Sequence, residues 1–478
     1  MKVLYVTSEC APFVKTGGLA DVMGALPRAA AAKRVSVRVM MPLYGSIGEQ
    51  WRSQMQFVKY VYISLSWRNL YCGLFEMKKD GMVYYFLDNE YYFKRGELYG
   101  HFDDGERFAF FSKAASDILP ELDWKPDVVH VNDWQTALVP VYIHRLYAGH
   151  PFYEGIRTVL TIHNIEYQGR YDRALVGDIF GLPDSFVEDG TLAFMGGISL
   201  LRGGIECASA VTTVSPTYAD ELQYPFYAHG MEGVLTRNRH KLSGILNGID
   251  MTLYDPKTDP NLEHNFGPDT LSDRVYNKLD LQKILALNQD ETIPIIAMVS
   301  RLVGHKGLDL VTASLDAIMD MSVQLVILGR GDWHYEQVFI NAQNTYSGRL
   351  SASIMVNFGL AMKLFGGADI FLMPSQAEPC GLSQMMAMRY GAVPVVRETG
   401  GLRDTVHPYI PETGEGNGFT FANYNAGDMQ YVLSQAVETY HNKEAWAVLQ
   451  RRNMGLDFGW SDSAAKYLTL YRNLTGKR

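Results

Sequence analysis

The stretch VLYVTSECAPFVKTGGLADVMGALP (Val3–Pro27) decides the fold class of the chain. It opens with a short apolar run, passes through a turn that contains Gly17 and Gly18, and continues from Asp21 with helical periodicity. A run that is apolar on both faces and leads into a helix is typical of a parallel strand covered by helices. The turn also suits an anion, because the first amides of a helix lack partners within it, and Lys15 adds a positive charge. The glycines match neither the phosphate-loop pattern nor a complete dinucleotide-binding fingerprint, so alone they indicate only a tight turn.

The same pattern recurs along the rest of the chain and predicts a doubly wound α/β architecture in both halves. In the first half the predicted strands are Val3–Val6, Val37–Met41, Val83–Leu87, Asp127–Val131, Thr158–Ile162 and Ala210–Val214. In the second half they are Pro294–Val299, Val323–Leu328, Asp369–Met373 and Val393–Val396.

With 478 residues the chain is too long for one compact core. We therefore expect an N-terminal Rossmann-like domain over residues 1–246 and a second over residues 247–458, with a cleft between them. The tail (459–478) has apolar residues at helical spacing, and we expect this helix to rejoin the N-terminal domain. Since parallel sheets bind ligands outside the carboxyl ends of their strands, the chemistry should lie at those ends.

Composition excludes several classes of protein. A formal net charge of −9 and the lack of any Lys and Arg run argue against nucleic acid as a partner. The four cysteines are scattered without a CxxC pair, which argues against a zinc site and a disulfide framework. The N-terminus lacks the long apolar stretch of a signal peptide, and we find no membrane-spanning segment, so a cytoplasmic location is expected.

Further motifs follow in a defined order along the chain. They are YFKRGELYG (Tyr92–Gly100), HVNDWQTALVP (His130–Pro140), TIHNIEYQG (Thr161–Gly169), TTVSPTYA (Thr212–Ala219), YAHGMEGVL (Tyr227–Leu235), LNGID (Leu246–Asp250), VSRLVGHKGLDL (Val299–Leu310), EPCGLSQMMAMRYG (Glu378–Gly391) and TGGLRDTV (Thr399–Val406). Together with KTGGLADVMGALP, this series resembles bacterial glycogen synthases and plant starch synthases over nearly the whole chain. The resemblance implies a GT-B fold, with two Rossmann-like domains, and retaining transfer of glucose from ADP-glucose to the non-reducing end of an α-1,4-glucan, without a cofactor.

In the second half, the residues expected to bind the donor follow two strands. Arg301 and Lys306 lie just after Pro294–Val299. By themselves they are more simply solvated cations of a surface loop, but the resemblance implies a phosphate-binding pair, in which an Arg fork and a Lys point charge clamp the diphosphate. The resemblance assigns Glu378 to the glucose as an essential acid, and either a nucleophilic or an orienting role is open. It also assigns phosphate and sugar oxygens to the turn that follows, formed by Cys380, Gly381, Leu382 and Ser383.

In the first half, the expected residues contact the donor sugar and the acceptor. The resemblance places His163 against the donor sugar, with Asn164 beside it on the same loop and Asn247 in a similar role. Asp133 and Trp134 follow a strand, where a carboxylate could accept hydroxyl protons and an indole could stack on a sugar. Core filling is an equally good interpretation of Trp134. Tyr99 resembles an acceptor-site tyrosine, and Lys15, Gly17 and Gly18 would bind donor phosphate.

The chemistry of retention leaves two routes open, and we favour the front-face route, in which a diphosphate oxygen takes the proton of the acceptor hydroxyl. No metal-ligand pattern is present, so we expect the two cations to replace a metal. Two departures from the family pattern, Val356 and Gln376, bear on nucleotide choice and donor affinity. The alternatives are a related GT-B transferase that uses UDP-glucose or a small acceptor, and a non-catalytic glucan-binding scaffold.

Overall fold

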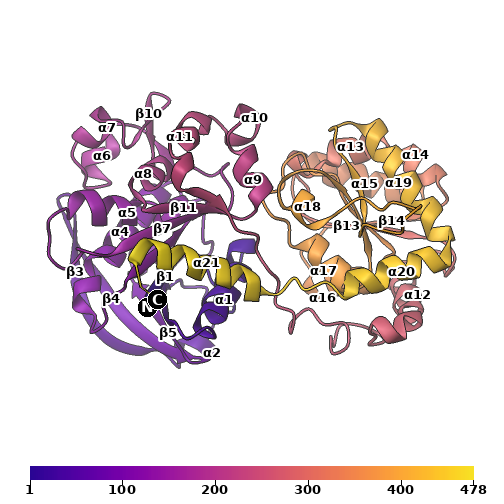
Figure 1. Cartoon of the computed structure of the whole chain (residues 1–478), viewed down its shortest axis with the longest axis horizontal. Helices are drawn as coiled ribbons and strands as arrows, with labels where there is room; N and C mark the ends of the chain where they lie inside the picture. The colour runs from indigo at the N-terminus through magenta and orange to yellow at the C-terminus, as the bar shows by residue number, and fades with distance from the viewer. Residues whose placement is uncertain (478) are drawn as a thin grey trace. The chain divides into compact units, whose positions relative to one another are not determined.

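The computed structural model describes residues 1–477, and the chain forms two compact units (Figure 1). Unit 1 comprises Met1–Asn247 and the C-terminal residues from Trp460, and unit 2 comprises Gly248–Gly459. Within the described residues, no helix combines the length and the apolar character that crossing a membrane requires.

Unit 1 is built on a nine-stranded sheet with the order β12-β11-β7-β6-β1-β2-β5-β4-β3. Its strands are β1 (Lys2–Val6), β2 (Ser36–Pro42), β3 (Gln56–Leu65), β4 (Arg68–Lys79), β5 (Met82–Asp88), β6 (Val128–Asn132), β7 (Arg157–Ile162), β11 (Ala210–Thr213) and β12 (Leu242–Gly244). Strand β4 is antiparallel to both β5 and β3, and the remaining pairs are parallel. A small second sheet contains β8 (Arg170–Tyr171), β10 (Gly197–Ser199) and β9 (Ala193–Phe194).

The helices of unit 1 cover both faces of this sheet because the strand order reverses between β1 and β6. The chain moves one way from β1 to β2 and the opposite way from β6 to β7, so right-handed crossovers place their helices on opposite faces. The helices are α1 (Gly18–Ala31), α2 (Glu49–Arg52), α3 (Glu90–Phe93), α4 (Asp104–Asp117), α5 (Leu138–Val141), α6 (Leu175–Asp178), α7 (Ser185–Glu188), α8 (Leu200–Cys207), α9 (Pro216–Glu221), α10 (Pro225–Ala228), α11 (Glu232–Arg237) and α21 (Trp460–Thr475).

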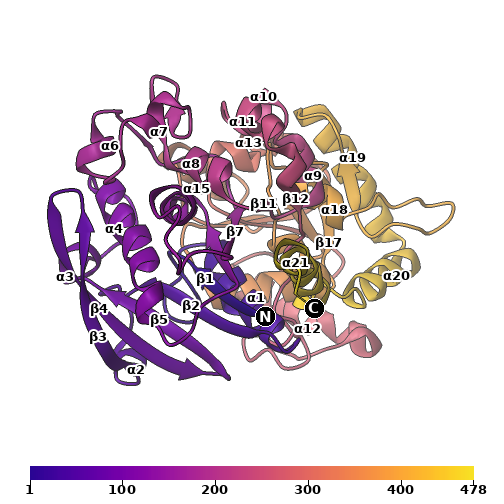
Figure 2. The same ribbon diagram turned by 60° about the vertical axis from the view of Figure 1, so that its left-hand side comes forward.

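The C-terminal helix α21 packs beside α1 and lies over the sheet of unit 1 (Figures 1 and 2). Buried His130 of β6 hydrogen-bonds through Nδ1 to the hydroxyl of Tyr471 at 2.6 Å and through Nε2 to Thr161 Oγ1 at 2.6 Å. Asp127 binds both ends of the chain, since it accepts from the Lys2 amide at 2.8 Å and from Lys477 Nζ at 2.5 Å. The two termini therefore lie together on unit 1.

Unit 2 is a six-stranded, fully parallel sheet with the order β15-β14-β13-β16-β17-β18. Its strands are β13 (Ile295–Val299), β14 (Gln324–Leu328), β15 (Leu350–Ser353), β16 (Ile370–Met373), β17 (Val393–Arg397) and β18 (Phe419–Phe421). The helices are α12 (Arg274–Ile284), α13 (Leu308–Ala313), α14 (Leu315–Asp320), α15 (Trp333–Thr345), α16 (Phe358–Gly367), α17 (Ser383–Arg389), α18 (Gly400–Thr405), α19 (Ala426–His441) and α20 (Lys443–Met454). In Figure 1, α13, α14, α15 and α19 lie on one side of this sheet and α12, α16 and α17 on the other.

All ten strands predicted from the sequence are present, and the predicted doubly wound class is confirmed. The prediction missed the long hairpin of β3 and β4, which extends the sheet of unit 1 at one edge (Figure 2). Its outer positions are exposed aromatic and polar side chains, so it lacks the continuous apolar pattern of a buried strand.

Candidate active site

In both units some of the expected site residues follow the strands between which the strand order reverses. In unit 1 this point is between β1 and β6, and in unit 2 it is between β13 and β16. Loops that leave two such strands diverge toward opposite faces of the sheet and open a crevice that commonly binds ligands. Lys15 and Asp133 follow β1 and β6, whereas Lys306 and Glu378 follow β13 and β16.

In unit 2, Lys306 and Glu378 form a close ion pair. Lys306 Nζ lies 2.6 Å from Glu378 Oε2, and Ser375 Oγ donates to the same carboxylate oxygen at 3.2 Å. Both charged side chains are largely buried, with exposed fractions of 16% and 8%. The structure thus brings together two residues that are 72 positions apart and that the sequence assigned to one site.

Glycines hold the backbone around Glu378 in place. A Cβ atom at Gly401 would lie 2.0 Å from the carbonyl oxygen of Cys380, and one at Gly400 would lie 1.9 Å from that of Glu378. The Gly401 amide donates to the Glu378 carbonyl at 3.1 Å. The TGGL motif is therefore a support for the Glu378–Cys380 backbone, because only glycine permits so close an approach.

The remaining expected residues of unit 2 lie around this pair. Arg301 is exposed and follows β13. Gly381 has a positive φ of 68°, which turns the chain from Cys380 through Leu382 into α17, and Ser383 is the first residue of that helix. The turn is thus of the expected kind, although α17 itself has only seven residues.

In unit 1, Asp133 is bonded to the loop that carries His163 and Asn164. The backbone amide of His163 donates to Asp133 Oδ1 at 2.7 Å. Burial raises the pKa of Asp133 to about 7, against the opposing effect of hydrogen bonds from the amides of His163 and Asn164. Asp133 also has a positive φ of 56°, which is rare outside glycine, and such strain is concentrated at functional sites.

The ring of His163 is fixed in its neutral form. Its Nε2 lies 2.9 Å from Asn132 Oδ1, and the Asn132 amide nitrogen donates to the Val6 carbonyl at 3.1 Å. Because Asn132 Oδ1 can only accept, Nε2 of His163 carries the proton. Burial lowers the pKa of His163 to about 3, so the ring is uncharged at neutral pH.

The structure adds Glu9, which the sequence reasoning missed. This buried carboxylate accepts from the Thr16 amide at 2.6 Å and from the Tyr99 hydroxyl at 3.2 Å, and Tyr99 also lies 2.8 Å from Ser8 Oγ. Burial raises the pKa of Tyr99 well above its usual value. An acid three residues after the first strand is a signal that could have pointed to Glu9.

The glycine turn ahead of α1 has the expected form. Gly17 is the N-cap of α1, and a Cβ atom placed there would have nothing within 4 Å among the described residues. Lys15 pairs with Asp21 in the first turn of that helix, with Nζ and Oδ1 2.6 Å apart. Gly18 is the first residue of α1.

Trp134 and Asn247, two further expected residues of unit 1, are both buried. Trp134 is only 9% exposed and packs against the rings of Phe108 and Tyr171, which favours core filling over the predicted stacking on a sugar. Asn247 is also buried, and among the described residues its Oδ1 has no hydrogen-bond partner. A buried acceptor without a partner is costly, and a ligand hydroxyl would satisfy it.

Comparisons with known proteins show which family the chain belongs to. Residues 2–237 match the model of the starch synthase catalytic domain, and residues 282–448 match that of glycosyl transferases group 1. A glycogen synthase of Desulforamulus reducens is 47% identical over 474 residues, which cover 99% of each chain. The chain belongs to the glycogen and starch synthase family.

Other relatives of this family are similar over the same length. A glycogen synthase of Clostridium perfringens is 46% identical and covers 99% of this chain and 98% of its own. The catalytic domain of starch synthase IV from Arabidopsis thaliana, solved with ADP and acarbose, is 31% identical, with a TM-score of 0.91 and 99% of each chain covered. A sucrose-phosphate synthase of Thermosynechococcus elongatus (16% identity, TM-score 0.62, each chain covered in full) shares the fold. The chain is a GT-B glycosyltransferase of the family that makes glucans.

Where the family pattern would put a nucleobase-stacking aromatic, this member of the glycogen and starch synthase family has Val356. Its side chain is 90% exposed in the turn before α16, and Asn357 caps that helix by accepting from the Leu360 amide at 3.0 Å. Phe358 is half-exposed and lies 6.3 Å from the ring of Tyr254. Within residues 1–477, no group of three or more His, Cys, Asp or Glu side chains could hold a metal ion.

Proposed function

We propose that the chain elongates α-1,4-glucan by transferring glucose from ADP-glucose to a non-reducing-end hydroxyl with retention of configuration. The observation that carries the proposal is the buried Lys306–Glu378 pair at the switch point of unit 2. A departing nucleotide develops charge on its phosphate oxygens, and preorganised cations at that position stabilise it. The ADP in the starch synthase IV structure supports adenine as the base.

In this proposal Lys306 and Arg301 bind the pyrophosphate, and Glu378 orients the glucose. Glu378 Oε2 already accepts from Lys306 and from Ser375, so this oxygen is less nucleophilic than an unpaired carboxylate. That pairing favours the front-face route, in which the leaving diphosphate takes the acceptor proton, over a covalent glucosyl-enzyme intermediate. The Cys380–Ser383 turn contributes backbone amides to the donor, and no cofactor is required.

The residues of unit 1 bind the donor sugar and the acceptor. The neutral ring of His163 is held by Asn132, which leaves its backbone carbonyl available to stabilise the positive charge that develops on the sugar. Asn247 Oδ1 accepts a sugar hydroxyl, and Lys15 with Gly17 and Gly18 binds donor phosphate. Asp133, Glu9 and Tyr99 form the acceptor side, where buried carboxyl groups accept hydroxyl protons.

The test measures donor and acceptor use by the purified chain. ADP-glucose and UDP-glucose are each supplied with glycogen, free glucose or fructose, and the anomeric configuration of new linkages is read by proton NMR. We expect ADP-glucose with glycogen to give the highest turnover, with new linkages only in the α configuration. Preferred use of UDP-glucose or of a small acceptor would support the related transferase instead. If the folded protein consumed no nucleotide-activated glucose, only the hypothesis of a non-catalytic glucan-binding scaffold would remain.

A further inference from the structure

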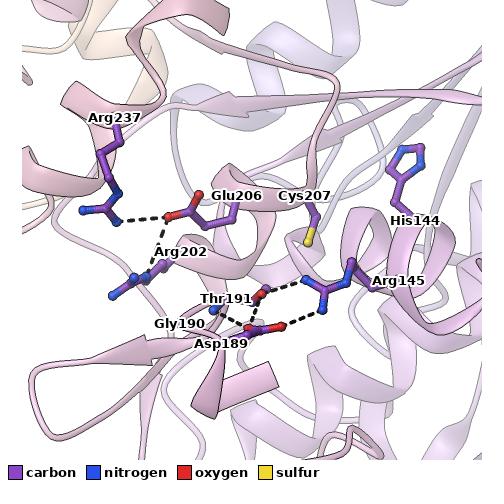
Figure 3. Close-up of a pocket in the computed structure, with 9 residues that line it drawn as sticks. All are labelled: His144, Arg145, Asp189, Gly190, Thr191, Arg202, Glu206, Cys207 and Arg237. Atoms are coloured by element: carbon purple, nitrogen blue, oxygen red, sulfur yellow. Dashed lines mark hydrogen bonds and ion pairs between the residues drawn. The ribbon is translucent and has the colours of Figure 1, made fainter. Parts of the chain in front are cut away.

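Unit 1 contains a pocket to which the proposed function assigns no role (Figure 3). Its volume is about 580 Å³, within the range of small-molecule sites. The walls come from the C-terminal end of α8, the end of α11, the segment that follows α5, and the Asp189–Thr191 loop. None of the residues that we assign to donor or acceptor lines it.

The lining of this pocket is rich in arginine, although the chain as a whole is acidic. Its charged residues are Arg145, Arg202, Arg237, Asp189 and Glu206, which leaves one excess positive charge. The two other titratable residues in the lining add no charge at neutral pH: burial lowers the pKa of His144 to about 4 and raises that of Cys207 to about 11.

Arg145 is already paired, whereas Arg202 and Arg237 are not saturated. Arg145 donates to Thr191 Oγ1 at 2.9 Å and to Asp189 Oδ2 at 2.6 Å, which occupies both ends of its fork. Arg202 Nη1 donates to the Ala193 carbonyl, whereas its Nε is buried and has no hydrogen-bond partner among the described residues, and Glu206 Oε1 lies 3.9 Å from that Nε. Burial, together with the charge of Arg237, lowers the pKa of Arg202, as expected for a cation without enough compensating charge.

The carboxylate of Glu206 lies near both Arg202 and Arg237 and does not pair with one of them alone. Its Oε1 lies 3.2 Å from Arg237 Nη2, and its Oε2 accepts from Asn238 Nδ2 at 3.0 Å. Figure 3 shows Arg202 and Arg237 both directed at this one carboxylate. One acid therefore faces two guanidinium groups, each of which has donors to spare.

These arginines are not needed to satisfy the end of α8. The carbonyls there attract cations, but Lys241 Nζ already donates to the carbonyl oxygens of Glu206 and Ala208, both at 3.0 Å. Two carbonyls at this end of α8 thus have a partner other than Arg202 and Arg237.

We propose that this pocket binds a phosphate monoester of about the size of a sugar phosphate, held by Arg202 and Arg237. Guanidinium forks bind phosphate oxygens through paired, charge-assisted hydrogen bonds. The pocket volume leaves room for a sugar next to the phosphoryl group. Glu206 opposes the ligand, because its charge competes for the same donors.

The experiment is calorimetric titration of the full chain, in buffer without phosphate, with a hexose 6-phosphate, inorganic phosphate and the uncharged hexose. Saturating ADP is present throughout to occupy the proposed donor site. We expect the hexose phosphate to bind more tightly than inorganic phosphate and the uncharged hexose not to bind. Arg237→Gln should weaken binding at least about tenfold, because the variant loses a charged donor to the phosphate. Glu206→Gln should tighten binding several-fold, because the variant loses a negative charge that repels the phosphate.

Arg173→Gln is the matched control, because Arg173 is an exposed arginine of the same unit, 3.7 Å from Glu188 and outside the pocket. Thermal melts of all three variants show whether each is folded. Equal affinity of Arg237→Gln and Arg173→Gln, binding of inorganic phosphate alone, or no binding at millimolar concentrations would overturn the proposal.

Discussion

Lys306 Nζ lies 2.6 Å from Glu378 Oε2, on loops that leave two neighbouring parallel strands at the point where their order reverses. The pair is compact, largely buried and backed by the Ser375 hydroxyl. In the proposed function Lys306 binds the departing phosphate and Glu378 orients the sugar, and the first two predictions test these roles.

Lys306→Ala should lower kcat by about 100- to 1000-fold, because the variant loses a preorganised cation at the leaving group. Steady-state kinetics with ADP-glucose and glycogen measure the effect. Lys363→Ala is the matched control, since Lys363 Nζ also lies 2.6 Å from a carboxylate, Asp280 Oδ2, in the same unit. Equal kcat values for the two variants would show that Lys306 has no special role in the reaction.

Glu378→Gln should reduce turnover by orders of magnitude while the protein stays folded, because the amide carries no charge to hold Lys306 and orient the sugar. The comparison is Glu412→Gln, an exposed glutamate of the same unit, which should retain full activity. If Glu378→Gln kept near-normal kcat with an unchanged melting temperature, the carboxylate would have no essential role.

Asp133→Asn should change how stability depends on pH. Asp133 has a folded pKa of about 7, above its value of about 3.9 in an unfolded chain, so the folded state holds the proton more tightly. This contribution is fully present below pH 4 and is lost as pH rises through 7. Urea unfolding of both proteins from pH 4 to 8 should show the wild type losing stability relative to the variant. Parallel curves for the two proteins would contradict the raised pKa.

Gly401→Ala should abolish donor binding, because its Cβ would lie 2.0 Å from the Cys380 carbonyl and would displace the backbone that carries Glu378. Gly427→Ala, in α19, is the control, since its nearest contact would be an ordinary 3.4 Å from Asn425 Oδ1. Binding of ADP is read by calorimetry. Unchanged ADP affinity in a folded Gly401→Ala protein would show that the TGGL support is dispensable.

Chelation should leave activity unchanged, because we expect Lys306 and Arg301 to neutralise the pyrophosphate in place of a metal. Initial rates are compared with and without EDTA after dialysis. A large loss that magnesium restores would show that a cation takes part.

Much of the fold was predictable because its central strands are buried on both faces, which gives continuous apolar runs such as Val393–Val396. The hairpin of β3 and β4 was not predictable in this way, since Tyr60 and Tyr62 point into solvent. Its edge position is set by antiparallel pairing of β4 with β5 across the two-residue turn of Asp80 and Gly81. An Asp-Gly pair is a local hairpin signal, and the sequence analysis did not use it.

The candidate site was predictable in part. The positions of Lys306 and Asp133 at strand ends were predictable because the strands themselves were, and ligands of this class of sheet bind at such ends. Their roles stay predictions. The packing of Trp134 could not, because a tryptophan after a strand suits a core and a sugar equally well. Glu9 was missed because its partners Thr16 and Tyr99 converge on it only in three dimensions.

Asp127 bonds to both the Lys2 amide and the Lys477 side chain, and this has a practical consequence for engineering. A short peptide could link the segments that carry Lys2 and Lys477 without moving α21 from its place beside α1. Circular permutation, with new ends opened in an exposed loop of unit 2, would then offer a place there for a reporter.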